Sequence, residues 1–236
     1  MTVRAFSVCM DIAFVHYNTP ELSGALVRSI RKWTPDARIT VFDNSDRKPF
    51  PETEGVTIYD NTRAQIIDFD AFLERFPRRK LDEKSNFGSV KHTMSVDWLF
   101  DVLTDGFVLL DSDVLLKRDV SEIADPSVSW CGQLGHGLVF AYGRFRPRAL
   151  PFVCWLNVPM AREHGIRYFD ETRTWKLEPT MFYDTGASFY LDCRRVDLPE
   201  RQICWEDYAV HFKGGSWDDR DPTQFLIENR ALYVSK

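Results

Sequence analysis

Two aspartates stand two positions apart directly after a short apolar run. Asp111, Ser112 and Asp113 follow the run Phe107–Leu110 (FVLL). Side chains at positions i and i+2 of an extended chain point the same way, so the sequence predicts two carboxylates on one face. At a desolvated strand end they repel each other unless a cation lies between them, and a divalent cation can also hold phosphate oxygens. The alternative is a turn whose aspartates cap their own backbone.

A histidine near the end of the sequence is a candidate third ligand. His211 is followed by a lysine and two glycines in HFKGGSW. Imidazole beside carboxylates suits a transition metal such as Mn²⁺, and glycines let the backbone approach a ligand closely. We therefore predict that Mn²⁺ or Mg²⁺ is held by Asp111, Asp113 and His211, that Gly214 and Gly215 let the backbone approach a ligand, and that Lys213 neutralises a phosphate.

The elements that must position these residues alternate between strand and helix in the first half of the chain. Strands are predicted at Ile12–Val15, Ile39–Phe42, Val56–Tyr59 and Phe107–Leu110. Helices are predicted from Pro20, with Thr19 as N-cap, to a stop at Pro35, and from about Val90 to Leu103. Such units predict an α/β protein with a mostly parallel, doubly wound sheet flanked by helices.

Ligands of such sheets bind outside the carboxyl ends of the strands. The polar residues at the predicted strand ends are therefore where a ligand-binding site is expected. They are His16, Asn18, Asp43, Asn44, Asp60 and Asp111.

The second half of the chain is less regular. Strands are predicted at Leu138–Tyr142, Ser188–Leu191 and Ala209–Phe212, and the segment 152–183 has no clear period. The charged segment 76–84 (FPRRKLDEK) reads as a solvated loop. We expect one domain over residues 1–236, with a nucleotide-binding half (1–120) and a half that completes the acceptor and metal sites (121–236).

The quoted motifs resemble those of GT-A glycosyltransferases. FVLLDSDVLL (107–116) looks like their DxD motif, and FVHYNTPE (14–21) with ITVFDNS (39–45) looks like the opening of family 2 inverting enzymes. HFKGGSW (211–217) is similar to the histidine motif of glycogenin-like family 8 enzymes. The resemblance implies the GT-A fold and transfer of a hexosyl group from a UDP- or GDP-sugar to a glycan or glycolipid acceptor, with Asp111 at the ribose or at a metal-bound water.

The resemblance also suggests a base that deprotonates the acceptor hydroxyl in an inverting reaction. Asp184, in FYDTGA (182–187), is the preferred candidate, and Glu206 and Asp207, in CWEDY (204–208), are the alternatives. The N-terminal motifs look like those of inverting families, whereas the DxD flanks and the HFKGGSW ending look like those of retaining ones. We expect inversion, with retention as the alternative.

Two further groups of residues are assigned less directly. The start of the second helix offers backbone N–H groups to an anion, so Lys91 or His92 is expected at the diphosphate, unless Ser89 simply caps that helix. Five aromatic residues form either an acceptor platform or, as most aromatics do, part of the core. They are Trp155, Tyr168, Phe169, Trp175 and Tyr183.

Composition narrows the class of protein. The net charge of -5 argues against nucleic-acid binding, and no apolar run reaches the roughly 18 residues of a membrane span. Peripheral membrane association stays open. Five scattered cysteines indicate reduced thiols and a cytoplasmic protein. The competing classes are a nucleotidyltransferase, disfavoured because residues 15–22 contain no glycine, and a non-catalytic sugar-binding protein.

Overall fold

A seven-stranded, mostly parallel sheet forms the centre of the computed structural model, which describes residues 10–75, 87–139, 144–170, 183–213 and 220–234. The strand order is β10-β6-β9-β4-β1-β2-β3. Strand β9 runs antiparallel to both of its neighbours, and the other pairs are parallel. The strands are β1 Asp11–His16, β2 Arg38–Asp43, β3 Val56–Asp60, β4 Phe107–Leu110, β6 Trp130–Gly132, β9 Val153–Leu156 and β10 Glu200–Gln202.

Two small antiparallel pairs lie beside this sheet. In the first, β5 (Val114–Leu116) pairs with β11 (Ala209–His211). In the second, β7 (Leu134–Val139) pairs with β8 (Arg144–Ala149). The first pair joins the segment after β4 to a strand from near the end of the chain.

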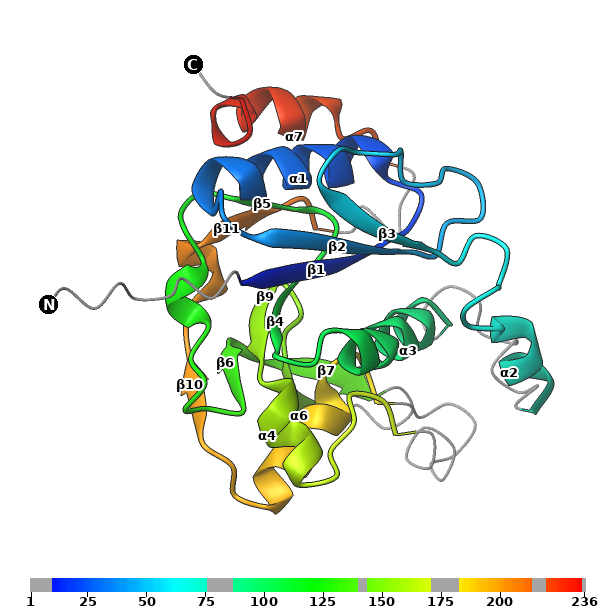
Figure 1. Ribbon diagram of the computed structural model, residues 1–236, viewed down its shortest axis with the longest axis vertical. Helices are drawn as coiled ribbons and strands as arrows, with labels where there is room; N and C mark the ends of the chain where they lie inside the picture. Colours follow the sequence, from blue (N-terminus) through cyan, green and yellow to red (C-terminus); the bar gives the residue numbers. More distant parts are fainter. Residues whose placement is uncertain (1–9, 76–86, 140–143, 171–182, 214–219, 235–236) are drawn as a thin grey trace, which may run out of the picture.

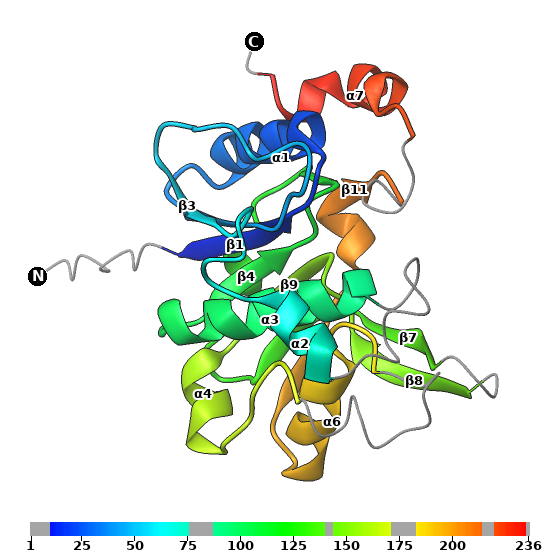
Figure 2. The same cartoon turned by 90° about the vertical axis from the view of Figure 1, so that its right-hand side faces the viewer.

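Helices cover both faces of the central sheet (Figure 1). Helix α1 (Pro20–Trp33) lies on one face, and helices α3 (Phe87–Val102), α4 (Val158–Glu163) and α6 (Ala187–Arg195) lie on the other. Helix α7 (Thr223–Glu228) packs over α1 in both views (Figure 2). The remaining short elements are α2 (Phe69–Arg75) and the 3₁₀ turns η2 (Ser121–Ile123), η3 (Trp205–Asp207) and η4 (Arg230–Leu232).

The apolar residues of the central strands alternate between two core layers. Ile12 and Phe14 belong to the layer that also holds Leu26 and Ile30 of α1. The intervening Ala13 belongs to the opposite layer, which includes residues of α3 and α6. Strand β4 is completely buried on both faces, which accounts for its unbroken apolar sequence.

Most predicted elements of the first half are confirmed. The four predicted strands are β1 to β4, the first helix starts at Pro20 with Thr19 before it, and the second starts at Phe87 rather than Val90. Thr19 occupies the N-cap position, but its side chain makes no capping hydrogen bond.

In the second half, β11 confirms the strand predicted from Ala209. The strand predicted at 188–191 is wrong, because these residues lie in helix α6. A short, largely apolar run fits either element, and Gly186 (φ +80°) precedes a helix here. Strand β7 starts at Leu134, earlier than predicted, while residues 140–142 and the charged segment 76–84 lie outside the described residues. The irregular segment 152–183 contains β9 and α4.

Candidate active site

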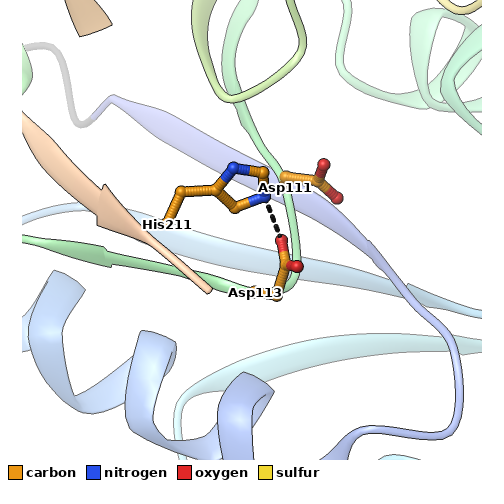
Figure 3. Close-up of side chains that lie close together, drawn as sticks. All are labelled: Asp111, Asp113 and His211. Carbon is orange, nitrogen blue, oxygen red and sulfur yellow. Dashed lines mark hydrogen bonds and ion pairs between the residues drawn. The ribbon is translucent and has the colours of Figure 1, made fainter. Parts of the chain in front are cut away.

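Asp111, Asp113 and His211 come together at the carboxyl end of β4. One ligand atom from each lies within 4.8 Å of those of the other two. The His211 Nε2 atom is 2.8 Å from Asp113 Oδ1 (Figure 3). The side chains of His211 and Asp113 are only 9% and 3% exposed. The three predicted metal ligands therefore form one compact, largely buried group.

A turn, rather than extended chain, brings the two carboxylates together. The Val114 N–H donates to the Asp111 carbonyl at 3.3 Å, and the Ser112 N–H donates to Asp111 Oδ1 at 3.0 Å. The predicted pairing of the carboxylates is thus correct, but its geometric reason is corrected. The backbone cap that was the alternative to a metal role is present as well.

Buried serines of α1 and the strand β11 hold this turn. The Ser23 hydroxyl donates to the Ser112 carbonyl at 3.5 Å, and the Ser29 hydroxyl accepts from the Leu116 N–H at 3.1 Å. Strand β11 pairs His211 with Val114, and the Phe212 N–H donates to the Asp113 carbonyl at 3.0 Å. The antiparallel register therefore places the imidazole beside the two aspartates.

The electrostatics of the group favour a cation. Burial and, second, the charge of Asp113 together raise the pKa of Asp111 to about 7, against the opposing effects of His211 and Arg148. Burial lowers the pKa of His211, but the hydrogen bond and charge of Asp113 outweigh it, so that the net shift is upward. Two carboxylates and one imidazole are a donor set that fits a divalent cation such as Mn²⁺ or Mg²⁺.

Asp184 lies just before α6 and is engaged by three donors. Arg148 of β8 forms an ion pair with Asp184 Oδ2 at 2.8 Å. The Ser89 hydroxyl and the Thr185 N–H both donate to Asp184 Oδ1, at 3.0 and 2.8 Å. The residue predicted as the base thus links β8, α3 and the start of α6.

Three of the predicted strand-end contacts are buried and bonded within the protein. His16 is bonded through Nδ1 to Ser23 and through Nε2 to the Lys48 carbonyl, and burial lowers its pKa. Asp43 accepts the backbone N–H groups of Ser45 and Phe50.

Asn44 donates to Ser95 and accepts from Asn61. It therefore ties the start of the loop after β2 to α3 and to the end of β3.

Asn18 and Asp60 lie nearer the surface. The Asn18 side chain accepts from the backbone N–H groups of Arg47 and Lys48 and donates to Asp46, while its own φ is +56°. Asp60, at the end of β3, is exposed and accepts from the Thr62 N–H at 2.8 Å. Asn18 therefore orders the loop that follows β2.

Lys91 and His92 have different surroundings at the start of α3. The Lys91 ammonium lies 5.3 Å from the centre of the Phe69 ring, and burial lowers its pKa against the opposing charges of Asp46 and Asp70. Both ring nitrogens of His92 are shielded from solvent and have no hydrogen-bond partner among the described residues. Burial, followed by the charge of Arg148, lowers the His92 pKa to about 4.

The other predicted site residues are distributed as follows. Trp155 and Tyr168 are buried in the core, which supports the core alternative for these two aromatics. Phe169 packs near Phe72, Tyr183 is partly buried, and Trp175 lies outside the described residues.

Near the end of the chain, Glu206 and Asp207 are exposed on η3. Lys213 is exposed with φ +60°, and Gly214 and Gly215 lie outside the described residues.

Residues that no motif indicated also border the site. Phe152 and Trp205 lie against the His211 ring, with ring centroids at 4.4 and 5.8 Å, and Arg148 holds Asp184. A hydrophobic residue before β9 and an arginine in a hairpin carry no signal of such roles in a single sequence. In the part of the chain that the structure describes, no helix has the length and apolarity to cross a membrane.

No family model matches the sequence, and no curated protein matches it either. Its structure is similar to that of the galactosyltransferase LgtC in complex with donor and acceptor sugar analogs, with TM-score 0.51 and 13% identity over 83% of this chain and 74% of that one. Core-mannan synthase A of Aspergillus fumigatus, in a Mn/GDP form, matches with TM-score 0.48 and 9% identity over 99% and 82% of the two chains. The glycosyltransferase GlyE of Streptococcus pneumoniae matches with TM-score 0.48 and 12% identity over 84% and 46%.

The likeness to LgtC shows the fold. The chain has the GT-A fold that the sequence motifs imply. The predicted α/β class with a mostly parallel central sheet is confirmed.

Proposed function

We propose that this chain, on its GT-A fold, is a metal-dependent glycosyltransferase. It transfers a hexosyl group from a UDP- or GDP-sugar to a glycan or lipid-linked acceptor. The observation that carries this proposal is the cluster of Asp111, Asp113 and His211 at the carboxyl end of the central strand, where ligands of α/β sheets bind. Clustered acids are common at protein surfaces, whereas Asp113 is buried here, and Asp111 and the His211 imidazole beside it are partly buried.

The proposed metal ligands follow from the geometry of the cluster. Asp113 and His211 would hold Mn²⁺ or Mg²⁺, and Asp111 would contact either the ribose or a metal-bound water. When bound, the cation offsets negative charge that builds on the leaving nucleoside diphosphate. Lys91 and Lys213 supply further positive charge for the phosphates. His92 fits this role less well, because its shielded ring stays neutral at pH 7.

The nucleoside would lie over the carboxyl ends of β1, β2 and β3. His16, Asp43 and Asn44 would act there by supporting the loop 45–48, and Asn18 by ordering it. Asp60 stays a proposed contact at the open end of β3. The proposed approach of Gly214 and Gly215 to the diphosphate rests on the sequence motif.

Inversion of configuration at the anomeric carbon, which the N-terminal motifs favour, needs a carboxylate that can take the acceptor proton. Both oxygens of Asp184 already accept hydrogen bonds, so proton transfer to it would disturb the ion pair with Arg148. Glu206 and Asp207 are exposed on the turn that leads into β11, which supports one of them as the base. We propose inversion with a base on η3, and Asp184 as the residue that ties α6 to β8.

A donor screen tests the proposed activity. Purified chain is incubated with common UDP- and GDP-sugars and Mn²⁺, and released nucleoside diphosphate is measured with and without a panel of glycan acceptors. Asp113→Ala should lower turnover by at least about 100-fold, because it removes a metal ligand. The matched control is Asp105→Ala, an exposed aspartate before the opposite end of β4, which should keep turnover within twofold.

The two competing functions, a nucleotidyltransferase and a sugar-binding protein, predict different results in this screen. A nucleotidyltransferase would release pyrophosphate from a sugar 1-phosphate and a nucleoside triphosphate. A sugar-binding protein would show a thermal shift with ligand but no turnover with any donor or acceptor. Undiminished turnover by Asp113→Ala would contradict the metal role at the centre of the proposal.

The cytoplasmic location and the partners also stay proposals. Among the described cysteines, Cys131, Cys154, Cys193 and Cys204 are free thiols, which supports a reducing compartment. Proposed partners are the nucleotide-sugar donor and a glycan or glycolipid acceptor, without nucleic acid and with peripheral membrane association left open.

A further inference from the structure

The imidazole of His211 packs against two aromatic rings that come from separate parts of the chain. The Phe152 ring centroid is 4.4 Å from that of the imidazole at an interplanar angle of 40°. The Trp205 ring stands nearly perpendicular to the imidazole at 5.8 Å. Phe152 and Trp205 also contact each other edge to face, with centroids 5.3 Å apart. The three rings form one packed group.

Both aromatic residues are fixed from outside the metal site. Trp205 is 7% exposed and belongs to the core layer on the α1 face of the sheet, and Phe152 packs against the same layer. The backbone N–H of Trp205 donates to Gln133 Oε1 at 3.2 Å, which anchors the start of η3. The two rings that contact His211 are therefore packed against the core outside the metal site.

The backbone and one hydrogen bond do not by themselves fix an imidazole. Strand pairing places the His211 backbone opposite Val114, and the contact between Nε2 and Asp113 fixes one ring atom. Rotation of the ring about that contact remains, and packing on the ring face removes it. A metal-ligating side chain that is already held in position loses less conformational entropy when the metal binds.

Aromatic faces also suit the charge that the imidazole carries in a metal complex. A cation above an aromatic face is attracted by the ring quadrupole, and the attraction grows where water is excluded. The apolar surroundings of metal ligands control solvent access and the local dielectric, and loss of a group that orients a metal ligand typically costs about 10- to 100-fold in metal affinity where that group is a hydrogen-bond partner. Phe152, at the shorter distance, should contribute more than Trp205.

We propose that Phe152, backed by Trp205, is a positioning residue that sets the divalent-metal affinity of this site by holding the His211 ring. The inference rests on the proposed metal site. It assigns the metal affinity partly to residues that touch neither the metal nor the substrate.

Calorimetric titration of the metal-free chain with MnCl₂ tests the inference. Phe152→Leu should raise the dissociation constant for Mn²⁺ about tenfold, while Phe152→Tyr, which keeps the ring, should bind within about twofold of the unsubstituted chain. The matched control is Phe50→Leu, because Phe50 packs edge to face on the non-ligand His16 at 5.4 Å. This control should lose thermal stability without losing Mn²⁺ affinity.

Activity gives a second readout. The Mn²⁺ concentration at half-maximal turnover should rise with Phe152→Leu, and turnover at saturating Mn²⁺ should recover to within a few-fold. If Phe152→Leu does not fold, Phe152→Met takes its place with the same expectations. Unchanged Mn²⁺ affinity in Phe152→Leu, or an equal loss in Phe50→Leu, would overturn the inference alone. Failure of the unsubstituted chain to bind Mn²⁺ would remove the proposed metal site as well.

Discussion

Single side chains decide how the metal site responds to pH. Asp111 and Asp113 lie side by side, and burial together with their mutual repulsion holds a proton on Asp111 up to about pH 7. The imidazole of His211 likewise keeps a proton more readily than usual. A metal ion can use these groups only after the protons have left.

The first prediction is therefore that Mn²⁺ stabilises the chain more at pH 8 than at pH 6. The pKa of Asp111 is raised above its ordinary value of 3.8, so the stability that this group gives the metal-free chain is lost as pH rises toward and through about 7. Binding of a divalent cation beside the charged carboxylate restores this stability. The thermal shift caused by Mn²⁺, measured by calorimetry at both pH values, should at least double.

Asp111→Asn provides the control for this pH dependence. It removes the titrating carboxyl group while keeping a side chain of similar size, so the difference between the two pH values should shrink. A thermal shift in the unsubstituted chain that falls from pH 6 to pH 8 would contradict the expected sign.

The second prediction separates the candidate bases. Asp184→Asn keeps the bonds from Ser89 and Thr185 feasible but removes the charge that pairs with Arg148. We expect a lower melting temperature and a fall in kcat of less than tenfold. One of Glu206→Gln and Asp207→Asn should lower kcat by at least about 100-fold, which is the usual contribution of a general base. Initial rates at saturating donor and acceptor give the comparison.

Arg148→Met offers a matched test of the structural role. It breaks the same ion pair from the other side, so it should lower the melting temperature about as much as Asp184→Asn. If Asp184→Asn alone abolished turnover while Arg148→Met did not, Asp184 would be the base after all.

The roles of individual side chains at the site could be predicted only in part from the sequence. The sequence predicted the group of Asp111, Asp113 and His211 because a DxD motif, a strand end and a histidine followed by glycines all indicated a metal site. His16, Asp43 and Asn44 also stand at strand ends, but their side chains point into the protein, and nothing in a single sequence distinguishes the two directions. Arg148 meets Asp184 through contacts between distant segments, which no local pattern records.

The elements around the site depend on a few backbone positions. Gly186 has φ +80° and precedes α6, and a Cβ atom there would overlap the carbonyl oxygen of Ala149 in β8. Only glycine therefore allows α6 to begin against β8. This close approach places Asp184 within reach of Arg148.

The third prediction concerns this glycine. Gly186→Ala should lower the free energy of unfolding by about 2–4 kcal/mol, from the strained φ and the overlap together. Gly165→Ala is the matched control, because Gly165 has φ +65° but an added Cβ would have no atom within 4 Å. It should cost only about 1 kcal/mol. Urea denaturation of both variants gives the two values, and equal losses would show that the contact with β8 is unimportant.

Sequence periodicity predicted the first half of the fold better than the second. Strands β1 to β4 and helix α1 carry clear apolar patterns and stop signals, and their predicted bounds agree with the structure within one or two residues. Helix α6 has a short, largely apolar run that fits either element, and residues 188–191 were predicted as a strand. Its identity depends on packing against β8, a contact between distant segments.

At the scale of the whole molecule, the two halves of the sequence share their elements. Strands β9, β6 and β10 extend the sheet begun by β4, and β11 completes the pair with β5. Asp97 of α3 accepts from the backbone of Tyr168 and Phe169 and from the Arg167 side chain. The indole N–H of Trp33 in α1 donates to the carbonyl of Leu232, which lies near the end of the chain. The metal site itself takes ligands from both halves.

The fourth prediction is that residues 1–236 unfold as one cooperative unit. The chain exceeds the roughly 150 residues below which two-state unfolding is usual, so a single transition here would reflect the interleaved sheet rather than small size. In scanning calorimetry the calorimetric and van't Hoff enthalpies should agree, and far-ultraviolet circular dichroism and tryptophan fluorescence should give coincident urea transitions. Because Asp111 and Asp113 belong to one half and His211 to the other, Mn²⁺ should move both spectroscopic transitions together by the same amount. Two separate transitions, with only the second shifted by metal, would mean that the halves fold independently and that the site assembles after the halves have folded.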